Sequence, residues 1–299
     1  GSPIMSDEPE DVKDITSICG GLNINIGTLN TRTISGMFAA GERANELGHA
    51  TLLDPVGAGA RALRTNTAVE LMEKIRFDVI RGNISEIKTL AQGSGTTKGV
   101  DADVADAVTE ENLEEGVAFA KAFAKKAGCI VAITGAIDLV SDGETCYVIR
   151  NGRPEMGKIT GTGCQLSGMM TAFLTANPDR KLEAAAAAVC TMGLAGEIGW
   201  SYMQKGDGNS TYRNRIIDAE WQQDAVAENT YLTEINIYAD DRSGILFDIT
   251  KILSEANISV NSINSRTSKQ GKATITISFS IKSVDQLNTI IAKIRNVES

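Results

Sequence analysis

The chain has 299 residues, of which 42% are hydrophobic and 22% charged, and this composition is typical of a globular protein with about two domains. The formal net charge of −9 argues against a nucleic-acid partner, because such partners are bound through clustered Lys and Arg. No apolar run approaches the roughly 20 residues of a membrane span, so we expect no membrane partner.

The cysteine pattern indicates a reducing compartment. Five cysteines are widely spaced, odd in number and never arranged as CxxC, and the single histidine leaves no set of zinc ligands. The N-terminal residues 1–14 have neither a basic start nor an apolar stretch, so nothing indicates secretion. We expect a cytoplasmic protein.

Residues 1–219 alternate short apolar segments with amphipathic or alanine-rich ones. Strands are predicted at 22–27, 50–55, 77–82 and 130–134, helices at 31–47, 63–74 and 83–91, a hairpin over 139–149, and two helices over 163–203. Such alternation predicts an α/β domain with a doubly wound, mostly parallel sheet, and the last two helices would cover one of its faces.

The character of the sequence changes near residue 220. Residues 220–230 are polar and read as a linker, and residues 231–299 form a second, smaller domain. Its predicted order is strand 231–239, helix 245–256, strands 258–266 and 272–281, and helix 283–295. This βαββα order is α+β and ferredoxin-like, without the final strand of that fold.

Two polar clusters follow predicted strands, at the sheet edge where open α/β sheets bind ligands. Asp54 begins DPVGAGA (54–60) and could hold Mg²⁺ through water, although a strand-terminal Asp before an ordinary turn explains it equally well. In RGNISEI (81–87), Arg81 could face phosphate and Glu86 could supply a second acidic group. The alternative for Asn83 and Glu86 is a plain capping box at the start of a helix.

A third cluster, TGTGCQLSG (160–168), opens a helix with small residues and two glycines. Successive backbone N–H groups at a helix start suit an anion, including the charge on a transferring phosphoryl group. Cys164 would lie in that positive field, which favours a thiolate. The alternative is that Cys164 is a small, buried apolar residue.

The motifs DPVGAG, RGNxSEI, AITGAxD and TGTGCxLS, in this order, resemble those of the hydroxyethylthiazole kinases of the ribokinase-like superfamily. The resemblance covers residues 1 to about 219. It implies ATP- and Mg²⁺-dependent phosphorylation of the hydroxyl of 4-methyl-5-(2-hydroxyethyl)thiazole in thiamine salvage, usually by a trimer with active sites between subunits. It also implies a further segment with the first strand of the sheet before residue 1, so we expect a sheet incomplete at its N-terminus.

The same resemblance assigns roles to individual residues. Asp54 and Glu86 would organise Mg²⁺, while Cys164 stands where ribokinase relatives have an aspartate base. The remaining assignments are Arg81, Thr134 and Asn83 to ATP, Gly161, Thr162 and Gly163 to an anion hole, and Met5 with Gly161 to the thiazole pocket.

Residues 231–281 resemble ACT domains, especially the C-terminal ACT domain of the (p)ppGpp synthetase/hydrolases. The motif is DDRSGIL (240–246), in which Asp241, Arg242 and Gly244 would form a loop that contacts a ligand or a partner chain. ACT domains pair side by side, and pairing without any small ligand is an equally good interpretation.

The two resemblances leave three hypotheses open. The chain is a thiazole kinase with an appended regulatory module, a regulatory protein that acts through ACT pairing with an inert kinase part, or an artificial join of two fragments.

Overall fold

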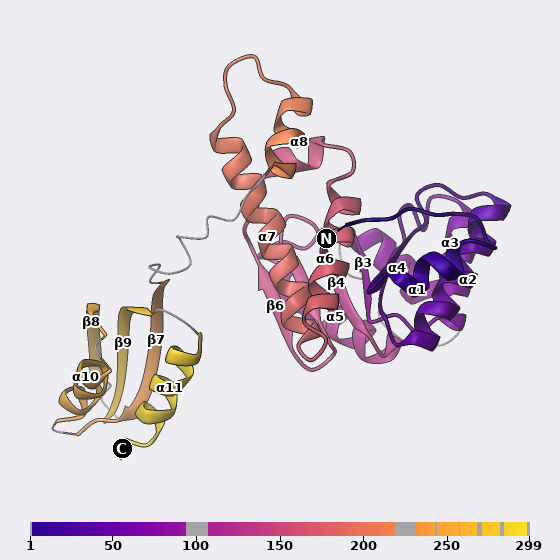
Figure 1. The fold of residues 1–299 in the computed structure, drawn as a ribbon. Helices are drawn as coiled ribbons and strands as arrows, with labels where there is room; N and C mark the ends of the chain where they lie inside the picture. Colours follow the sequence, from indigo (N-terminus) through magenta and orange to yellow (C-terminus); the bar gives the residue numbers. More distant parts are fainter. Residues whose placement is uncertain are drawn as a thin grey trace. The chain divides into compact units, whose positions relative to one another are not determined.

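The computed structural model describes residues 2–93, 107–218, 231–242, 244–256, 258–267, 271–281 and 284–297. The chain divides into two compact units, Gly1–Ala219 and Glu220–Ser299 (Figure 1). The predicted linker, residues 220–230, lies outside the described residues.

The described part of the first unit contains a six-stranded sheet in which the spatial order equals the chain order. Its strands are β1 (Gly21–Asn25), β2 (Ala50–Asp54), β3 (Val79–Gly82), β4 (Ile130–Ile133), β5 (Asp138–Ser141) and β6 (Cys146–Ile149). Strands β1 to β4 are parallel, and β5 and β6 add an antiparallel hairpin. The predicted mostly parallel α/β sheet is therefore confirmed. Among the described residues β1 pairs only with β2 and forms the outer edge.

Helices cover both faces of this sheet, as the near-continuous apolar strands require. Neighbouring residues Leu52 and Leu53 in β2 are both fully buried, and each belongs to a different apolar core. One core is covered by α2 (Thr31–Leu47), α3 (Ala62–Lys74), α4 (Ile84–Gly93) and α5 (Leu113–Ala127). The other contains α6 (Thr162–Ala176), α7 (Lys181–Ser201) and α8 (Asn209–Ile217), and Figure 1 shows α6 and α7 along that face. A short helix, α1 (Val12–Ile18), and a 3₁₀ turn, η2 (Pro154–Lys158), complete the described part of the unit.

Helix α7 is long and apolar enough to cross a membrane when judged by length and composition alone. Its alanine-rich face is buried in the second core, where Ala185 and Ala188 have no exposed surface. We therefore interpret α7 as a core helix of the first unit.

The second unit forms a three-stranded antiparallel sheet in the order β7–β9–β8 among its described residues. Its elements are β7 (Tyr231–Asp240), α10 (Ile245–Glu255), β8 (Val260–Thr267), β9 (Lys272–Ile281) and α11 (Val284–Arg295). Alternate residues of β9, including Ile275, Ile277 and Phe279, point into an apolar core with α10. The predicted βαββα order is confirmed.

Candidate functional site

Asp54 lies at the centre of a polar cluster at the carboxyl end of β2. The side chain has no exposed surface, and its Oδ2 accepts hydrogen bonds from Asn25 Nδ2 and Ser167 Oγ, both at 2.9 Å. Among the described residues Oδ1 has no hydrogen-bond partner, and Arg81 Nη1 lies 3.7 Å from it. One oxygen of a buried carboxylate is thus left open beside a guanidinium.

The electrostatics of Asp54 favour a cation. Burial raises the pKa of this carboxyl, while the charge of Arg81 and the hydrogen bond from Ser167 oppose that rise. The negative charge of Glu86 raises the pKa further. A divalent cation near Oδ1 would favour the ionised form, because an opposite charge offsets the cost of desolvation.

Glu86 and Asn83 form a capping box at the start of α4, which is the alternative that the sequence analysis gave for these two residues. Asn83 N donates to Glu86 Oε2, and Glu86 N donates to Asn83 Oδ1, each at 2.9 Å. Glu86 Oε1 also accepts from Gly57 N at 2.8 Å, which ties the DPVGAG turn to this helix. No group of three or more His, Cys, Asp or Glu side chains converges on one point in the described ranges. Asp54, with its open Oδ1, fits a hydrated Mg²⁺, because this ion takes one or two carboxylates and completes its shell with water and phosphate.

The glycine-rich turn packs directly against Arg81. Gly161 caps α6 with φ 97°, a left-handed conformation that favours glycine. A Cβ on Gly163 would lie 2.7 Å from Arg81 Nη1, so the guanidinium can approach only because this residue has no side chain. Arg81 Nη2 in turn donates to Thr134 Oγ1 at 2.6 Å. The fold brings together the predicted anion loop, Arg81 and Thr134.

Cys164 is exposed in the first turn of α6, so the alternative of a buried apolar residue is wrong. Its Sγ accepts a hydrogen bond from Asn25 Nδ2 at 3.1 Å. The thiol therefore lies next to the Asp54 cluster and faces solvent, where a small molecule can reach it.

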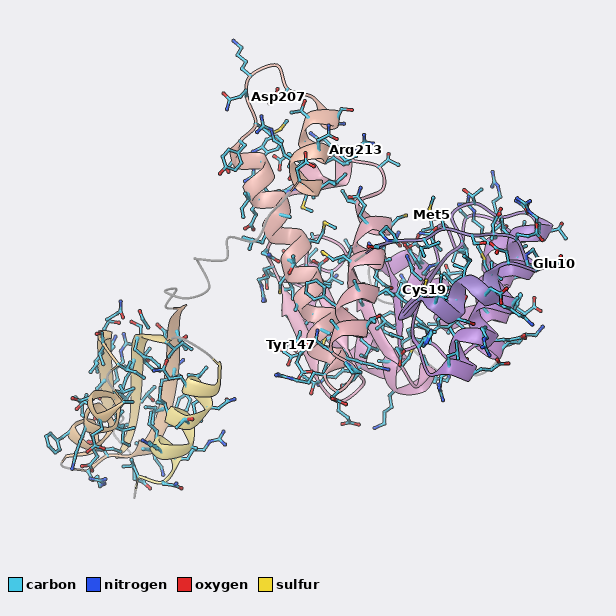
Figure 2. All side chains as sticks on the ribbon, in the orientation of Figure 1. Met5, Glu10, Cys19, Tyr147, Asp207 and Arg213 are labelled. Atoms are coloured by element: carbon cyan, nitrogen blue, oxygen red, sulfur yellow. The ribbon has the colours of Figure 1, made fainter. Side chains whose placement is uncertain are left out.

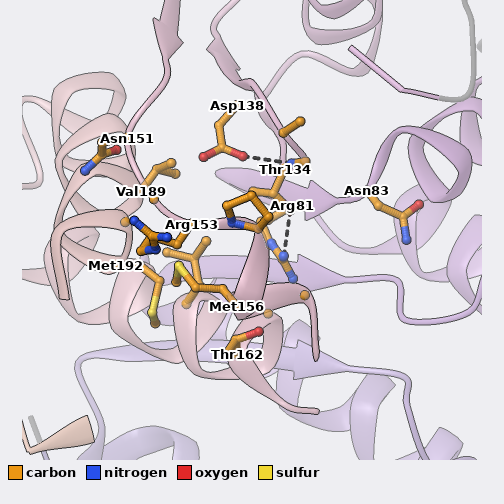
Figure 3. Close-up of a pocket in the computed structure, with 18 residues that line it drawn as sticks. Arg81, Asn83, Thr134, Asp138, Asn151, Arg153, Met156, Thr162, Val189 and Met192 are labelled. Carbon is orange, nitrogen blue, oxygen red and sulfur yellow. Dashed lines mark hydrogen bonds between the residues drawn. The ribbon is translucent and has the colours of Figure 1, made fainter. Parts of the chain in front are cut away.

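A cavity of about 560 Å³ opens beside this cluster (Figure 3). Arg81, Asn83, Thr134, Thr162 and Gly163 line one part of it, and Asp54, Glu86 and Cys164 are not among the lining residues. The rest of the lining comes from the segments 135–138 and 151–157, from Leu166 and from α7, with Val189 and Met192. The cavity thus has a polar part near Arg81 and a mixed part, in which apolar side chains lie beside polar ones.

The segment 151–157 is held against α7 by close contacts that the sequence analysis did not include. Gly152 N donates to Glu197 Oε1 at 2.8 Å. Gly193 and Gly196 of α7 leave no space for a Cβ, because the side chains of Asn151 and Met156 lie against them. The three-residue spacing of Gly193 and Gly196 was the sequence signal that another segment packs closely against α7.

Asp138 is a further cavity residue that the sequence analysis did not single out, although it ends the AITGAID motif. Its Oδ1 accepts from Gly135 N at 2.8 Å (Figure 3). Burial raises the pKa of this carboxyl to about 6, against the effect of the Gly135 hydrogen bond and the charge of Arg81. The group titrates closer to neutrality than an ordinary aspartate.

Met5, which the sequence analysis assigned to a thiazole pocket, lies in the N-terminal segment with its side chain pointing outward (Figure 2). It is 94% exposed and does not line the cavity. The assignment of Met5 to a thiazole pocket therefore stays a prediction.

In the second unit the described residues of the predicted ligand loop make local contacts. Asp241 N donates to Gly271 O at 2.8 Å, Arg242 Nη2 pairs with Asp248 Oδ2 at 2.7 Å, and Gly244 caps α10 with φ 89°. A cavity of about 390 Å³ lies beside it, lined by Arg242, Asp248, Lys251, Ile252, Glu255 and Val297. Both charge signs are present in this lining.

Comparison with known proteins identifies both units. The model of the hydroxyethylthiazole kinase family matches residues 1–225, and an ACT domain model matches residues 227–299. The hydroxyethylthiazole kinase of Clostridium acetobutylicum is 56% identical over 223 residues, which are 75% of this chain and 82% of that protein. The chain belongs to the hydroxyethylthiazole kinase family.

Other members of the hydroxyethylthiazole kinase family show the same relationship. The hydroxyethylthiazole kinase of Ruminiclostridium cellulolyticum is 46% identical over 73% of this chain and 78% of its own length. The solved structure of the hydroxyethylthiazole kinase protein from Pyrococcus horikoshii superposes with a TM-score of 0.63 at 31% identity, covering 73% of this chain and 77% of that one. The first unit is therefore the phosphotransferase domain of this family, with the ribokinase-like fold, and the second is an ACT domain.

Asp138 should make stability depend on pH. Because its pKa is raised in the folded state, the stability that it contributes is fully present below about pH 4 and is lost as pH rises through about 6. The Asp138→Asn variant has no carboxyl at this position and should not lose this stability. The difference in free energy of unfolding, variant minus parent, should therefore increase by up to about 2 kcal/mol between pH 4 and 7. Urea unfolding at a series of pH values measures this difference.

Asp142→Asn is the matched control for this measurement. Backbone hydrogen bonds, first from Thr145, lower the pKa of Asp142, so the stability that it contributes is already present above about pH 4 and is lost only at lower pH. The free energy of unfolding of the Asp142→Asn variant relative to the parent should therefore stay nearly constant between about pH 4 and 7. A difference for Asp138→Asn that stays constant from pH 4 to 7 would contradict the prediction.

Proposed function

We propose that the chain transfers the γ-phosphoryl group of ATP to the primary hydroxyl of 4-methyl-5-(2-hydroxyethyl)thiazole, with Mg²⁺, in thiamine salvage in the cytoplasm. The observation that carries the proposal is a connected set of contacts at the carboxyl edge of the sheet. Arg81 contacts both the Gly161–Gly163 turn and Asp54, and Asn25 links Asp54 to Cys164. The relationship to proteins named hydroxyethylthiazole kinase supplies the substrate.

ATP occupies the 560 Å³ cavity in this proposal. Arg81, Thr134 and Asn83 contact the phosphates at the polar part, and the part near Val189 and Met192 holds the base. Arg81 suits this role because it is only 11% exposed and because a guanidinium offers several donors to phosphate oxygens.

The N-terminus of α6 stabilises the transferring group. Backbone N–H groups of Gly161, Thr162 and Gly163 are at the positive end of the helix dipole, where they form an anion hole for the developing charge. Positioning and charge stabilisation provide most of the catalysis in phosphoryl transfer, so a strong base is not needed.

Asp54 and Glu86 hold Mg²⁺ in this scheme, and the ion when bound neutralises charge on the phosphates. Cys164 Sγ accepts the hydrogen bond of the substrate hydroxyl and so orients its oxygen toward the γ-phosphorus. The new oxygen–phosphorus bond forms as the bond to the ADP oxygen breaks, and the proton of the hydroxyl passes to Cys164 Sγ or to a phosphate oxygen.

Met5 and Gly161 contact the thiazole ring. Because Met5 is exposed in the single chain, this contact requires that Met5 complete a pocket between subunits, in keeping with a homotrimer.

Incubation of the chain with ATP, Mg²⁺ and the thiazole alcohol tests this proposal directly. We expect a phosphorylated thiazole and ADP in equal amounts, and loss of at least about 100-fold in kcat for Asp54→Asn, which removes the charge at the metal. Product analysis by mass spectrometry gives the readout. Absence of phosphorylated product from the folded parent chain would refute the kinase proposal.

Gly163→Ala tests the contact between the anion loop and Arg81. The added methyl group would displace the guanidinium, so we expect kcat/KM for ATP to fall by about 10- to 1000-fold while the chain stays folded. Gly168→Ala is the control on the same helix, because nothing lies within 4 Å of its Cβ position. Equal activity of the two variants would show that the Arg81 contact is irrelevant to the reaction.

We also propose that the ACT domain links copies of the chain through its sheet edge. Strand β8 supports this, because it is an edge strand that is exposed along its whole length and includes Val260 and Ile263. An unpaired edge strand is a template for pairing with another chain. Regulation through this domain, by pairing or by a ligand at Asp241, Arg242 and Gly244, is the second candidate function.

Ile263→Lys should weaken this pairing, because a charge on an edge strand opposes association. Light scattering on the full chain should report a smaller mass for Ile263→Lys than for the parent. Thr250→Lys places the same charge on α10 and should leave the mass unchanged. If the mass of Ile263→Lys equals that of the parent, β8 does not pair.

A further inference from the structure

Asn25 occupies a defined place at the edge of the sheet, outside the motifs that carry the family resemblance. It is the last residue of β1 and lies in register with Asp54, the last residue of β2. Helix α6 packs on these two strands. The side chains of Asn25 and Asp54 therefore meet the first turns of α6, where Cys164 and Ser167 lie one turn apart.

The orientation of the Asn25 amide is fixed by the backbone that follows it. Gly27 N donates to Asn25 Oδ1 at 2.8 Å, so the oxygen of the amide points back to its own turn. A Cβ on Gly27 would lie 2.8 Å from the same oxygen, so the turn is tight enough to need glycine. The nitrogen of the amide must then face away from the turn, toward α6.

Both donors of that nitrogen have partners. Asn25 Nδ2 lies 2.9 Å from Asp54 Oδ2 and 3.1 Å from Cys164 Sγ. A primary amide has two N–H groups, one for each of these acceptors. The sulfur is thereby an acceptor toward Asn25, and negative charge on it is stabilised by the donor.

The same amide also contacts only one of the two oxygens of Asp54. Asn25 and Ser167 both donate to Oδ2, while Oδ1 has no hydrogen-bond partner in the described part of the chain. Asn25 thus connects the carboxylate proposed for the metal with the thiol proposed for the substrate hydroxyl.

We propose that Asn25 is a positioning residue for phosphoryl transfer, holding Cys164 Sγ as a hydrogen-bond acceptor at a fixed place beside Asp54. This inference rests on the proposed kinase function, in which Cys164 orients the hydroxyl of the substrate. Asn25 acts through Cys164 and Asp54 and does not itself touch the reacting atoms.

Two substitutions separate hydrogen bonding from packing. Asn25→Asp keeps the size of the side chain and an acceptor for Gly27 N but removes both donors. Asn25→Ala removes the side chain and opens space around the sulfur. If Asn25 only fills space, the alanine variant should expose Cys164 and speed its alkylation, whereas loss of the donor should slow alkylation in both variants, because the thiolate is the reactive form.

The experiment measures alkylation of Cys164 in the full chain by iodoacetamide at fixed pH, followed by mass spectrometry of the peptides. Cys190, also exposed, is the internal reference in every sample. We expect the Cys164 rate to fall at least about fivefold in both variants while the Cys190 rate stays constant. We expect kcat to fall about 10- to 100-fold, with KM for ATP within about twofold of the parent.

Asn23→Ala is the matched control, because it removes an asparagine from the same strand and the same side of the sheet. Its Cys164 alkylation rate and kcat should equal those of the parent. Unchanged or faster Cys164 alkylation in both Asn25 variants would overturn the inference, and so would slower alkylation with unchanged kcat.

A failure of the kinase proposal would be seen in product formation and in the turnover of Cys164→Ala, not in the alkylation rates. If the parent makes no product, or if Cys164→Ala keeps full turnover, then the role of Cys164 in the proposed reaction is wrong. In that event the Asn25 role in the reaction also fails, while the alkylation rates still decide whether the amide acts on the sulfur.

Discussion

The burial of one carboxylate, Asp54, governs the arrangement of the whole site. A carboxylate without exposed surface is costly unless donors and positive charge surround it. Here Asn25 and Ser167 donate to one of its oxygens and Arg81 lies near the other. Removing any of these groups would leave the buried carboxylate with fewer donors or less positive charge, so its stability depends on residues from three distant parts of the chain.

The parallel sheet makes this convergence possible. The carboxyl ends of β1, β2 and β3 lie at one edge, so Asn25, Asp54 and the residues after Gly82 are neighbours although the chain separates them widely. Helix α6 reaches the same edge and brings a helix N-terminus to it. The apolar residues on both faces of the strands hold this geometry, because each face is buried under helices.

Much of this organisation could be predicted from local sequence patterns. The alternation of apolar strands and helices predicted the sheet, and Asp54, Arg81 and the TGTGC turn were found because they follow strands or open a helix. Helix α5 was missed although it has acidic residues in its first turn, basic ones in its last and Gly128 at its end. Asn25 was missed because its meaning depends on register: only pairing with β2 places it beside Asp54. The contacts of segment 151–157 were also missed, because the glycine spacing in α7 indicates a close approach but does not say which segment makes it.

Those glycines have a consequence for local stability. Each glycine within a helix disfavours it by about 1 kcal/mol relative to alanine, and Gly193, Gly196 and Gly199 all lie in the second half of α7. That half is therefore helical chiefly because Asn151, Met156 and the backbone of α8 near Arg215 pack against these positions. One wall of the cavity and the end of a core helix are thus packed on each other, and we expect a ligand that holds the wall in place to slow amide hydrogen exchange in the helix behind it.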